Sequence, residues 1–253
     1  MLLFRKLFRG AKVFWAFAYS TVELVITRPK TRRARAGWLS GLCRRILRAV
    51  DITWTVSGPV PDQGAVISNH LTYVDILLHS AMRPCVFVSA IEVRRMPVFG
   101  WLSMMAGTVY VKRGVGGSAA KAAGGMAEGL RDGLPVVFFP EGGTGVGDVP
   151  LLPLHSGLLA NALEEGAPVT PGFIHYDINP ADAARGKTAR DDIAWGTQTL
   201  PAHLWNLLGL QPFQGHIVFA QGPIGFSPEA HKNRKIAANQ AREAVYALLT
   251  VPK

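Results

Sequence analysis

Residues 65–80 read AVISNHLTYVDILLHS, and their pattern gives the clearest indication of the architecture. A short apolar run, residues 65–68, leads into a polar segment and then into a helix-like segment at residues 73–80. Continuous apolar runs of this length are typical of strands that are buried on both faces of a sheet. The stretch therefore predicts a strand–loop–helix unit whose loop lies at the carboxyl end of a buried strand.

The same alternation continues on both sides of this unit. Further strands are expected at residues 52–57, 86–89, 108–111, 136–139, 169–174 and 217–220, and further helices at residues 117–131, 156–164, 201–208 and 228–249. The polar segment 179–192 predicts a surface loop. Strands alternating with helices over 253 residues favour an α/β fold, a single αβ-sandwich domain at residues 51–253 with a mixed, largely parallel sheet flanked by helices.

The charge of the chain is concentrated at its N-terminus. The formal net charge is +10, yet residues 1–50 hold twelve lysines and arginines against one acid, Glu23, so the remaining residues are close to neutral. A near-neutral body behind a strongly basic segment indicates an anionic partner surface, either phospholipid or nucleic acid.

Residues 3–22 form an amphipathic pattern at helical spacing. Apolar side chains share one stripe: Phe4, Leu7, Phe8, Ala11, Phe14, Trp15 and Ala18. Cations fall opposite: Arg5, Lys6, Arg9 and Lys12. This arrangement suits the interface of an anionic bilayer, where each cation contributes about 1 kcal/mol. Because the aromatic residues lie within the apolar stripe, we expect no nucleic acid partner.

The apolar run at residues 13–26 is shorter than the about 20 residues that a membrane span needs, and it contains Glu23. We expect a helix that rests on the membrane, with a single span, a solvated arm and a signal peptide as alternatives. A second basic and apolar helix at residues 37–50 is expected to pair with it. Cys43 and Cys85 suggest neither a disulfide framework nor a metal pair, which favours a reducing, cytoplasmic setting.

In that setting, residues 1–50 predict a membrane-associated helix pair at the cytoplasmic face of the inner membrane, monotopic or single-span.

Two polar side chains follow the strand at residues 65–68. His70 and Asp75 are five residues apart, a spacing that turns them about 140° from each other within one helix. They converge if His70 lies in the loop and Asp75 in the first helical turn, behind Thr72 as the N-cap. A neutral histidine there accepts a hydroxyl proton while the carboxylate fixes its tautomer. The alternative is structural, a capping box from Thr72 to Asp75.

Two more polar segments follow apolar runs. Residues 138–145, FFPEGGTG, contain glycines that let backbone N–H groups turn toward an anion, while Glu141 organises the loop or orients a hydroxyl. Residues 107–113, GTVYVKR, end in Arg113, whose planar fork suits a phosphate. Taken separately, a strand-to-loop turn and a solvated strand end explain them at least as well.

In this order, the three segments resemble the glycerolipid acyltransferase family, in particular the lysophosphatidic acid acyltransferase (1-acyl-sn-glycerol-3-phosphate acyltransferase) group. The family's His-x4-Asp box falls on His70 and Asp75, its arginine box on residues 107–113 and its Phe-Pro-Glu-Gly box on residues 139–142. A valine–proline block is similar to residues 169–171. The resemblance covers roughly residues 50–225.

The resemblance implies transfer of a fatty acyl group from acyl-CoA or acyl carrier protein to the free hydroxyl of a lysolipid, with 1-acyl-sn-glycerol-3-phosphate as the first choice. His70 would act as general base and Asp75 would orient it, with no acyl-enzyme, no cofactor and no metal. The substrate-binding positions carried over are Asn69, Arg113, Glu141, Gly142, Gly143 and Thr144. The family also has N-terminal helices that rest on the membrane.

The acceptor loop departs from the family pattern. Members commonly read Pro-Glu-Gly-Thr-Arg-Ser, whereas here Gly143 precedes Thr144 and Gly145 stands where an arginine is often found. One cation for a phosphate acceptor is therefore missing. Lyso-ornithine lipid is the alternative acceptor, and segment 194–204 resembles relatives that acylate it. A non-catalytic membrane-binding protein is the alternative class.

The remaining histidines carry no motif. His79 lies one turn after Asp75, but no further acidic cluster accompanies it to make a metal site. The others are expected to be structural or surface residues: His155, His175, His203, His216 and His231.

Overall fold

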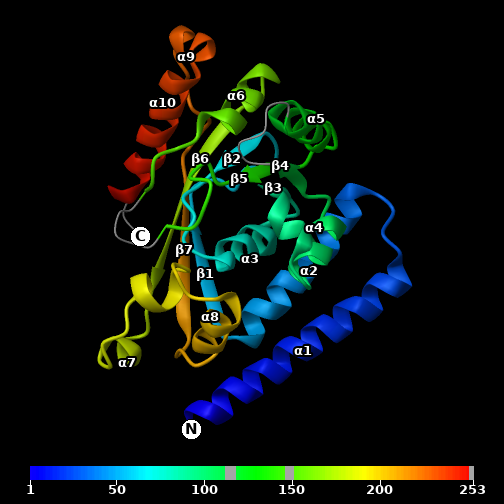
Figure 1. Cartoon of the computed structure of the whole chain (residues 1–253), viewed down its shortest axis with the longest axis vertical. Coiled ribbons are helices and arrows are strands. Elements are labelled where there is room, and N and C mark those ends of the chain that lie inside the picture. Colours follow the sequence, from blue (N-terminus) through cyan, green and yellow to red (C-terminus); the bar gives the residue numbers. More distant parts are fainter. Residues whose placement is uncertain (112–117, 146–150, 251–253) are drawn as a thin grey trace.

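The computed structural model describes residues 1–111, 118–145 and 151–250, with residues 118–123 and 250 described by their backbone alone. Its centre is a seven-stranded sheet in the order β1-β7-β6-β2-β5-β3-β4 (Figure 1). The strands are β1 Ile52–Ser57, β2 Ala65–Ile67, β3 Val86–Ala90, β4 Val109–Val111, β5 Val136–Phe138, β6 Val169–Asp177 and β7 Phe213–Phe219. Among these described strands, β6 and β7 pair antiparallel and the other neighbours pair parallel. The expected mixed, largely parallel sheet is confirmed.

The described helices surround this sheet. They are α1 Leu2–Thr27, α2 Arg32–Ala49, α3 Tyr73–Met82, α4 Phe99–Met105, α5 Ser118–Arg131, α6 Ser156–Glu164, α7 Pro180–Ala183, α8 Leu200–Leu207, α9 Pro228–Lys232 and α10 Arg234–Ala247. The helix expected at residues 228–249 is divided, because the Asn233 side chain accepts the Lys235 N–H at 3.0 Å and caps a new helix. The segment expected as a polar loop, residues 179–192, contains α7 and most of a short π-helix, η2 Ala189–Ile193.

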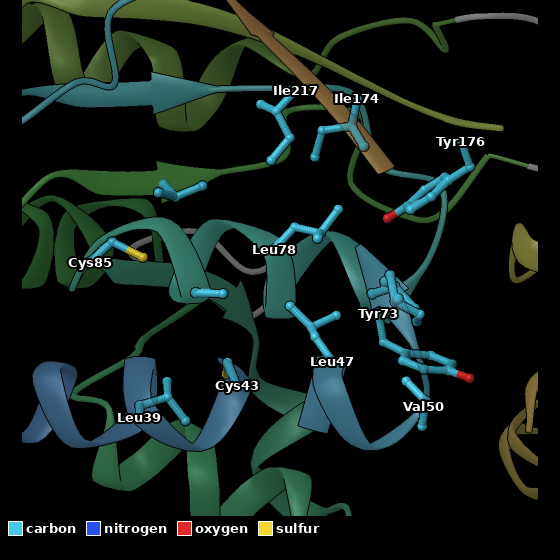
Figure 2. Close-up of a cluster of buried hydrophobic side chains, with 14 of the residues drawn as sticks. Leu39, Cys43, Leu47, Val50, Tyr73, Leu78, Cys85, Ile174, Tyr176 and Ile217 are labelled. Atoms are coloured by element: carbon cyan, nitrogen blue, oxygen red, sulfur yellow. The ribbon is translucent and has the colours of Figure 1, made fainter. Parts of the chain in front are cut away.

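The core lies on both faces of the sheet. Helices α2 and α3 cover one face, and α6 and α10 cover the other (Figure 1). On the first face, Leu47 of α2 and Leu78 of α3 pack toward Ile174 of β6 (Figure 2). In β2, Val66 points into this cluster, whereas Ala65 and Ile67 belong to the cluster on the other face. Because both of its faces are buried, β2 needs a continuous apolar run and cannot alternate with polar residues.

Helix α1 lies along the edge of the molecule, with α2 between it and the sheet (Figure 1). Polar contacts join the two helices. The Trp38 indole N–H donates to the Ser20 carbonyl at 2.7 Å, and Arg45 pairs with Glu23 at 2.7 Å. The apolar side of α2, including Leu42 and Leu47, is buried against the body of the protein. This second helix therefore belongs to the core as well as to the expected helix pair.

The two faces of α1 are disposed differently from the simple expectation. Its basic face is turned inward: the Arg9 side chain is 2% exposed, pairs with Asp51 at 2.9 Å and donates to the carbonyls of Leu208 and Leu210. The idea that all four cations meet lipid head groups is therefore wrong for Arg9. The apolar stripe faces outward, and Trp15 is 68% exposed. Within the described residues, no helix combines the length and hydropathy that crossing a bilayer requires.

Candidate active site

The histidine–aspartate pair meets as expected. His70 lies in the loop after β2, and Asp75 is the third residue of α3. The His70 Nδ1 is 2.8 Å from Asp75 Oδ2, with the imidazole 15% exposed and the carboxylate fully buried. Because Asp75 Oδ2 also accepts the N–H groups of Leu71 at 2.7 Å and Thr72 at 2.9 Å, the carboxylate caps the helix and holds the imidazole. The same side chain thus caps the helix, as the structural interpretation expects, and lies against the imidazole, while the catalytic role of the pair stays a prediction.

A tyrosine completes the shell around the carboxylate. The Tyr176 hydroxyl, from β6, donates to Asp75 Oδ1 at 2.5 Å, and burial raises the pKa of this phenol well above 10. The phenol therefore stays a donor at neutral pH. Tyr176 was not identified from the sequence, since it reads there as one more apolar position after the valine–proline block. Only the pairing of β6 beside β2 brings it to Asp75.

Aromatic packing fixes the plane of the imidazole. Phe139, at the end of β5, stacks on the His70 ring with centroids 4.0 Å apart and planes 11° apart. His79 packs edge-on against the same phenylalanine, and burial lowers its pKa to about 4. A neutral buried His79 adds no positive charge beside Asp75. The stack leaves His70 few orientations in which Nδ1 can still reach the carboxylate.

Glu141 ties two loops together. Its Oε1 accepts the His70 backbone N–H at 2.6 Å, and its Oε2 accepts the Leu152 N–H at 2.8 Å. The side chain is 7% exposed, and this burial raises its pKa to about 7 in spite of the two N–H donors. This geometry matches the expectation that Glu141 organises the loop. Its assignment to substrate binding stays a prediction.

The glycine-rich loop closes over the His70 backbone. The Gly145 N–H donates to the His70 carbonyl at 2.8 Å, and the Thr144 hydroxyl donates to the Trp195 carbonyl at 2.7 Å. Gly142 has a φ of 74°, and a Cβ there would lie 2.7 Å from Cδ2 of His155. Among the described residues, no atom lies within 4 Å of a Cβ built at Gly143. The loop thus requires a glycine at position 142 for its backbone and does not require one at position 143, and the substrate-binding assignment of Gly142, Gly143 and Thr144 stays a prediction.

Two expected substrate residues have different outcomes. Asn69 is 1% exposed, and its side-chain amide exchanges hydrogen bonds with the Ile174 backbone, at 2.8 Å to the carbonyl and 2.7 Å from the N–H. It therefore joins the end of β2 to β6, and a substrate role for it stays a prediction. Arg113 lies outside the described residues.

Three loops thus converge at the carboxyl ends of β2 and β5. They are residues 68–72, residues 139–145 and residues 194–196, the last joined to the first by the Trp195 N–H, which donates to the Leu71 carbonyl at 2.8 Å. Strand ends of open α/β sheets are where ligands bind. A mostly buried imidazole aimed by a buried carboxylate can transfer a proton there. Fold and site together define the class of the protein as an α/β protein with a histidine–aspartate pair at the carboxyl ends of its strands.

Comparisons with known proteins specify this class. Residues 52–175 match the family model described as Acyltransferase, a range that includes His70, Asp75 and Glu141. The chain is 35% identical over 218 residues to a lyso-ornithine lipid O-acyltransferase of Pseudomonas aeruginosa, covering 86% of this chain and 78% of the relative. It is 32% identical over 186 residues to a 1-acyl-sn-glycerol-3-phosphate acyltransferase of Neisseria gonorrhoeae, covering 72% and 69%. The chain belongs to the acyltransferase family.

A solved structure shares the fold. The crystal structure of the 1-acyl-sn-glycerophosphate (LPA) acyltransferase from Thermotoga maritima matches with a TM-score of 0.66 at 21% identity, over the full length of both chains. At this identity the match supports the α/β fold and its helical flanks, and the chemistry of the site is argued from its own residues.

Proposed function

We propose that this protein transfers a fatty acyl group from an acyl thioester, either acyl-CoA or acyl carrier protein, to the free hydroxyl of a lysolipid, with His70 as general base. The observation that carries the proposal is the contact of 2.8 Å between His70 Nδ1 and the buried Asp75 carboxylate. With Nδ1–H donated to Asp75, the lone pair of the imidazole is on Nε2, at the opposite side of the ring.

The proton and the acyl group move in opposite directions. His70 Nε2 takes the proton of the acceptor hydroxyl, and the hydroxyl oxygen attacks the thioester carbonyl carbon. The carbon–sulfur bond then breaks, and the departing sulfur takes the proton from His70, so that a free thiol is released. Asp75 stabilises the imidazolium between these steps, and Tyr176 keeps Asp75 in place. No residue of the protein is acylated.

The acceptor has two candidates. The first is 1-acyl-sn-glycerol-3-phosphate, which would give phosphatidic acid. The second is lyso-ornithine lipid, which is favoured by Gly145, since it offers no side-chain cation in the loop where family members often have an arginine. The Pseudomonas aeruginosa relative, which matches over more of the chain than the Neisseria gonorrhoeae relative, carries that name.

Helix α1 supports a bilayer location for this reaction. Its outward stripe exposes Phe4 at 73%, Phe14 at 67% and Trp15 at 68%, which is an apolar surface of the kind that lies in the head-group region. Because the inward cations Arg9 and Lys12 both pair with Asp51, the helix is held to the body with this stripe outward. We infer that α1 rests in the interface of the inner membrane at its cytoplasmic face.

One assay tests the reaction and its acceptor together. Purified full-length protein is mixed with a panel of lysolipids, with acyl-CoA or acyl carrier protein as donor, and products are identified by mass spectrometry. We expect acylation of one acceptor class and loss of the product with His70→Ala. His231→Ala, an exposed histidine of α9, is the matched control and should keep full activity. Equal turnover by His70→Ala and wild type would remove His70 from the mechanism.

A further inference from the structure

A second cluster of ligating side chains lies outside the candidate active site. His175 and Asp177 of β6 and His216 of β7 share one face of the sheet near the end of β6. Each offers a nitrogen or carboxylate oxygen, and these atoms all lie within 4.8 Å of one another. It is the one such group of three found among the described residues. The reaction proposed above does not use it.

The sheet itself sets this arrangement. His175 and His216 are direct partners across the antiparallel β6–β7 pair, and their rings stack with centroids 4.7 Å apart and planes 15° apart. Asp177 follows His175 by two residues and therefore points to the same side of the strand. Its Oδ2 lies 3.0 Å from His216 Nε2. Three ligands are thus positioned by two adjacent strands rather than by a mobile loop.

A neighbouring strand supplies an orienting partner. Thr55 of β1 is in register with His216, and its Oγ1 lies 2.6 Å from His216 Nδ1. When Nδ1–H donates to this hydroxyl, the lone pair of His216 is on Nε2 and faces Asp177 and His175. Metal-ligating histidines are commonly held in this manner, with the second ring nitrogen bonded to an oxygen.

The cluster is separate from the dyad. Ile174 and Tyr176 alternate with His175 along β6 and point to the face covered by α3, where Tyr176 meets Asp75. The cluster therefore lies on the opposite face of the sheet. His216 is 13% exposed and Asp177 is 48% exposed, so the cluster is open to solvent on the side of Asp177.

We propose that His175, Asp177 and His216 bind one divalent transition-metal ion, with Zn²⁺ as the reference ion. Two imidazoles and a carboxylate suit zinc, which takes nitrogen and oxygen ligands at about 2.0–2.2 Å in a tetrahedral array with water in the fourth position. That geometry needs ligand atoms about 3.4 Å apart. The Asp177 carboxylate, which is 48% exposed, has room to rotate and shorten the remaining distance. The ion would tie β6 to β7.

The test measures metal binding and needs no activity. Full-length protein, stripped with chelator, is titrated with Zn²⁺ in a calorimeter and with Co²⁺, whose visible spectrum reports tetrahedral coordination. We expect one saturable site and a higher Tm with Zn²⁺. His216→Gln and Asp177→Asn should each weaken binding by at least about tenfold, as removal of even an outer-shell partner often does.

Two controls locate the site. His231→Gln, at an exposed position outside the cluster, and His70→Gln, in the dyad, should bind Zn²⁺ as wild type does. Asp177 is the most exposed of the three side chains, so Asp177→Asn is the substitution that disturbs the fold least. Circular dichroism of each metal-free variant reports whether it is folded. The proposal is overturned if wild type shows no saturable site, or if His216→Gln and Asp177→Asn both retain wild-type affinity. Loss of binding in His70→Gln alone would assign the ion to the dyad instead.

Discussion

Replacing Asp75 by asparagine separates charge from shape at the proposed catalytic pair. The carboxylate accepts four hydrogen bonds, from His70 Nδ1, the N–H groups of Leu71 and Thr72, and the Tyr176 hydroxyl. An asparagine can keep its oxygen toward the first three donors and turn its NH₂ toward the tyrosine oxygen, which then accepts. The cap of α3 and the position of the imidazole survive, and the negative charge does not.

The size of the loss follows from the distance. Two unit charges 2.8 Å apart interact by about 6 kcal/mol at an effective dielectric constant of about 20. This energy is available when His70 is protonated in the transition state. At 1.36 kcal/mol per factor of ten, it corresponds to about 10⁴ in kcat. The equivalent change in a Ser–His–Asp protease lowers kcat by a similar factor. We therefore expect Asp75→Asn to lower kcat by about 10³–10⁴, with a much smaller change in KM.

The assay is initial-rate acyl transfer to the acceptor identified by the lysolipid panel, with thermal unfolding of each variant as the fold control. Asp62→Asn, an exposed aspartate before β2, is the matched variant and should keep wild-type kcat. If Asp75→Asn folds with an unchanged Tm and retains kcat within about tenfold of wild type, Asp75 does not stabilise a protonated His70, and the proposed proton transfer is wrong.

Four further results are expected. Tyr176→Phe removes a hydrogen bond to a carboxylate, worth about 1.5–3 kcal/mol, and should lower kcat by about 10–100-fold with KM little changed. The control is Tyr73→Phe, which removes a hydroxyl that bonds His203 instead and should leave kcat unchanged. Burial raises the pKa of Glu141 from 4.5 to about 7, so the folded state binds the proton of this carboxyl group more tightly than the unfolded state does. The resulting contribution to stability is present below pH 4.5 and is lost as pH rises through 7. The Tm of wild type relative to Glu141→Gln should therefore fall across that window, and a constant difference in Tm would contradict the assignment. Gly142→Ala forces a side chain to a φ of 74° at about 1–2 kcal/mol and should lower Tm by about 2–8 °C, while Gly143→Ala, with open space and no positive φ, should leave Tm nearly unchanged. The double variant Phe14→Ser, Trp15→Ser should reduce flotation with anionic vesicles by at least about a hundredfold, and Tyr246→Ser, an exposed aromatic of α10, should not; vesicle binding that survives the first change would contradict the role given to α1.

Local pattern was sufficient for the elements and for one half of the site. Every expected strand exists, because an apolar run between turn residues has few alternatives to a buried strand. His70 and Asp75 could be paired from spacing, since the loop-to-helix geometry that joins them is contained within six consecutive residues. The helix α4 was missed because residues 99–105 carry neither a polar cap nor a clear period.

Long-range pairing decided the rest. Tyr176 reaches Asp75, and His216 reaches His175, only because β6 lies between β2 and β7, and no local signal fixes that strand order. The sequence alone determined that α1 has one apolar and one basic face. The tertiary structure decided which face of α1 lies against the protein. Asp51 and the backbone carbonyls near residue 209 bind the cations of α1, because a charge at a dry interface needs a bonded partner.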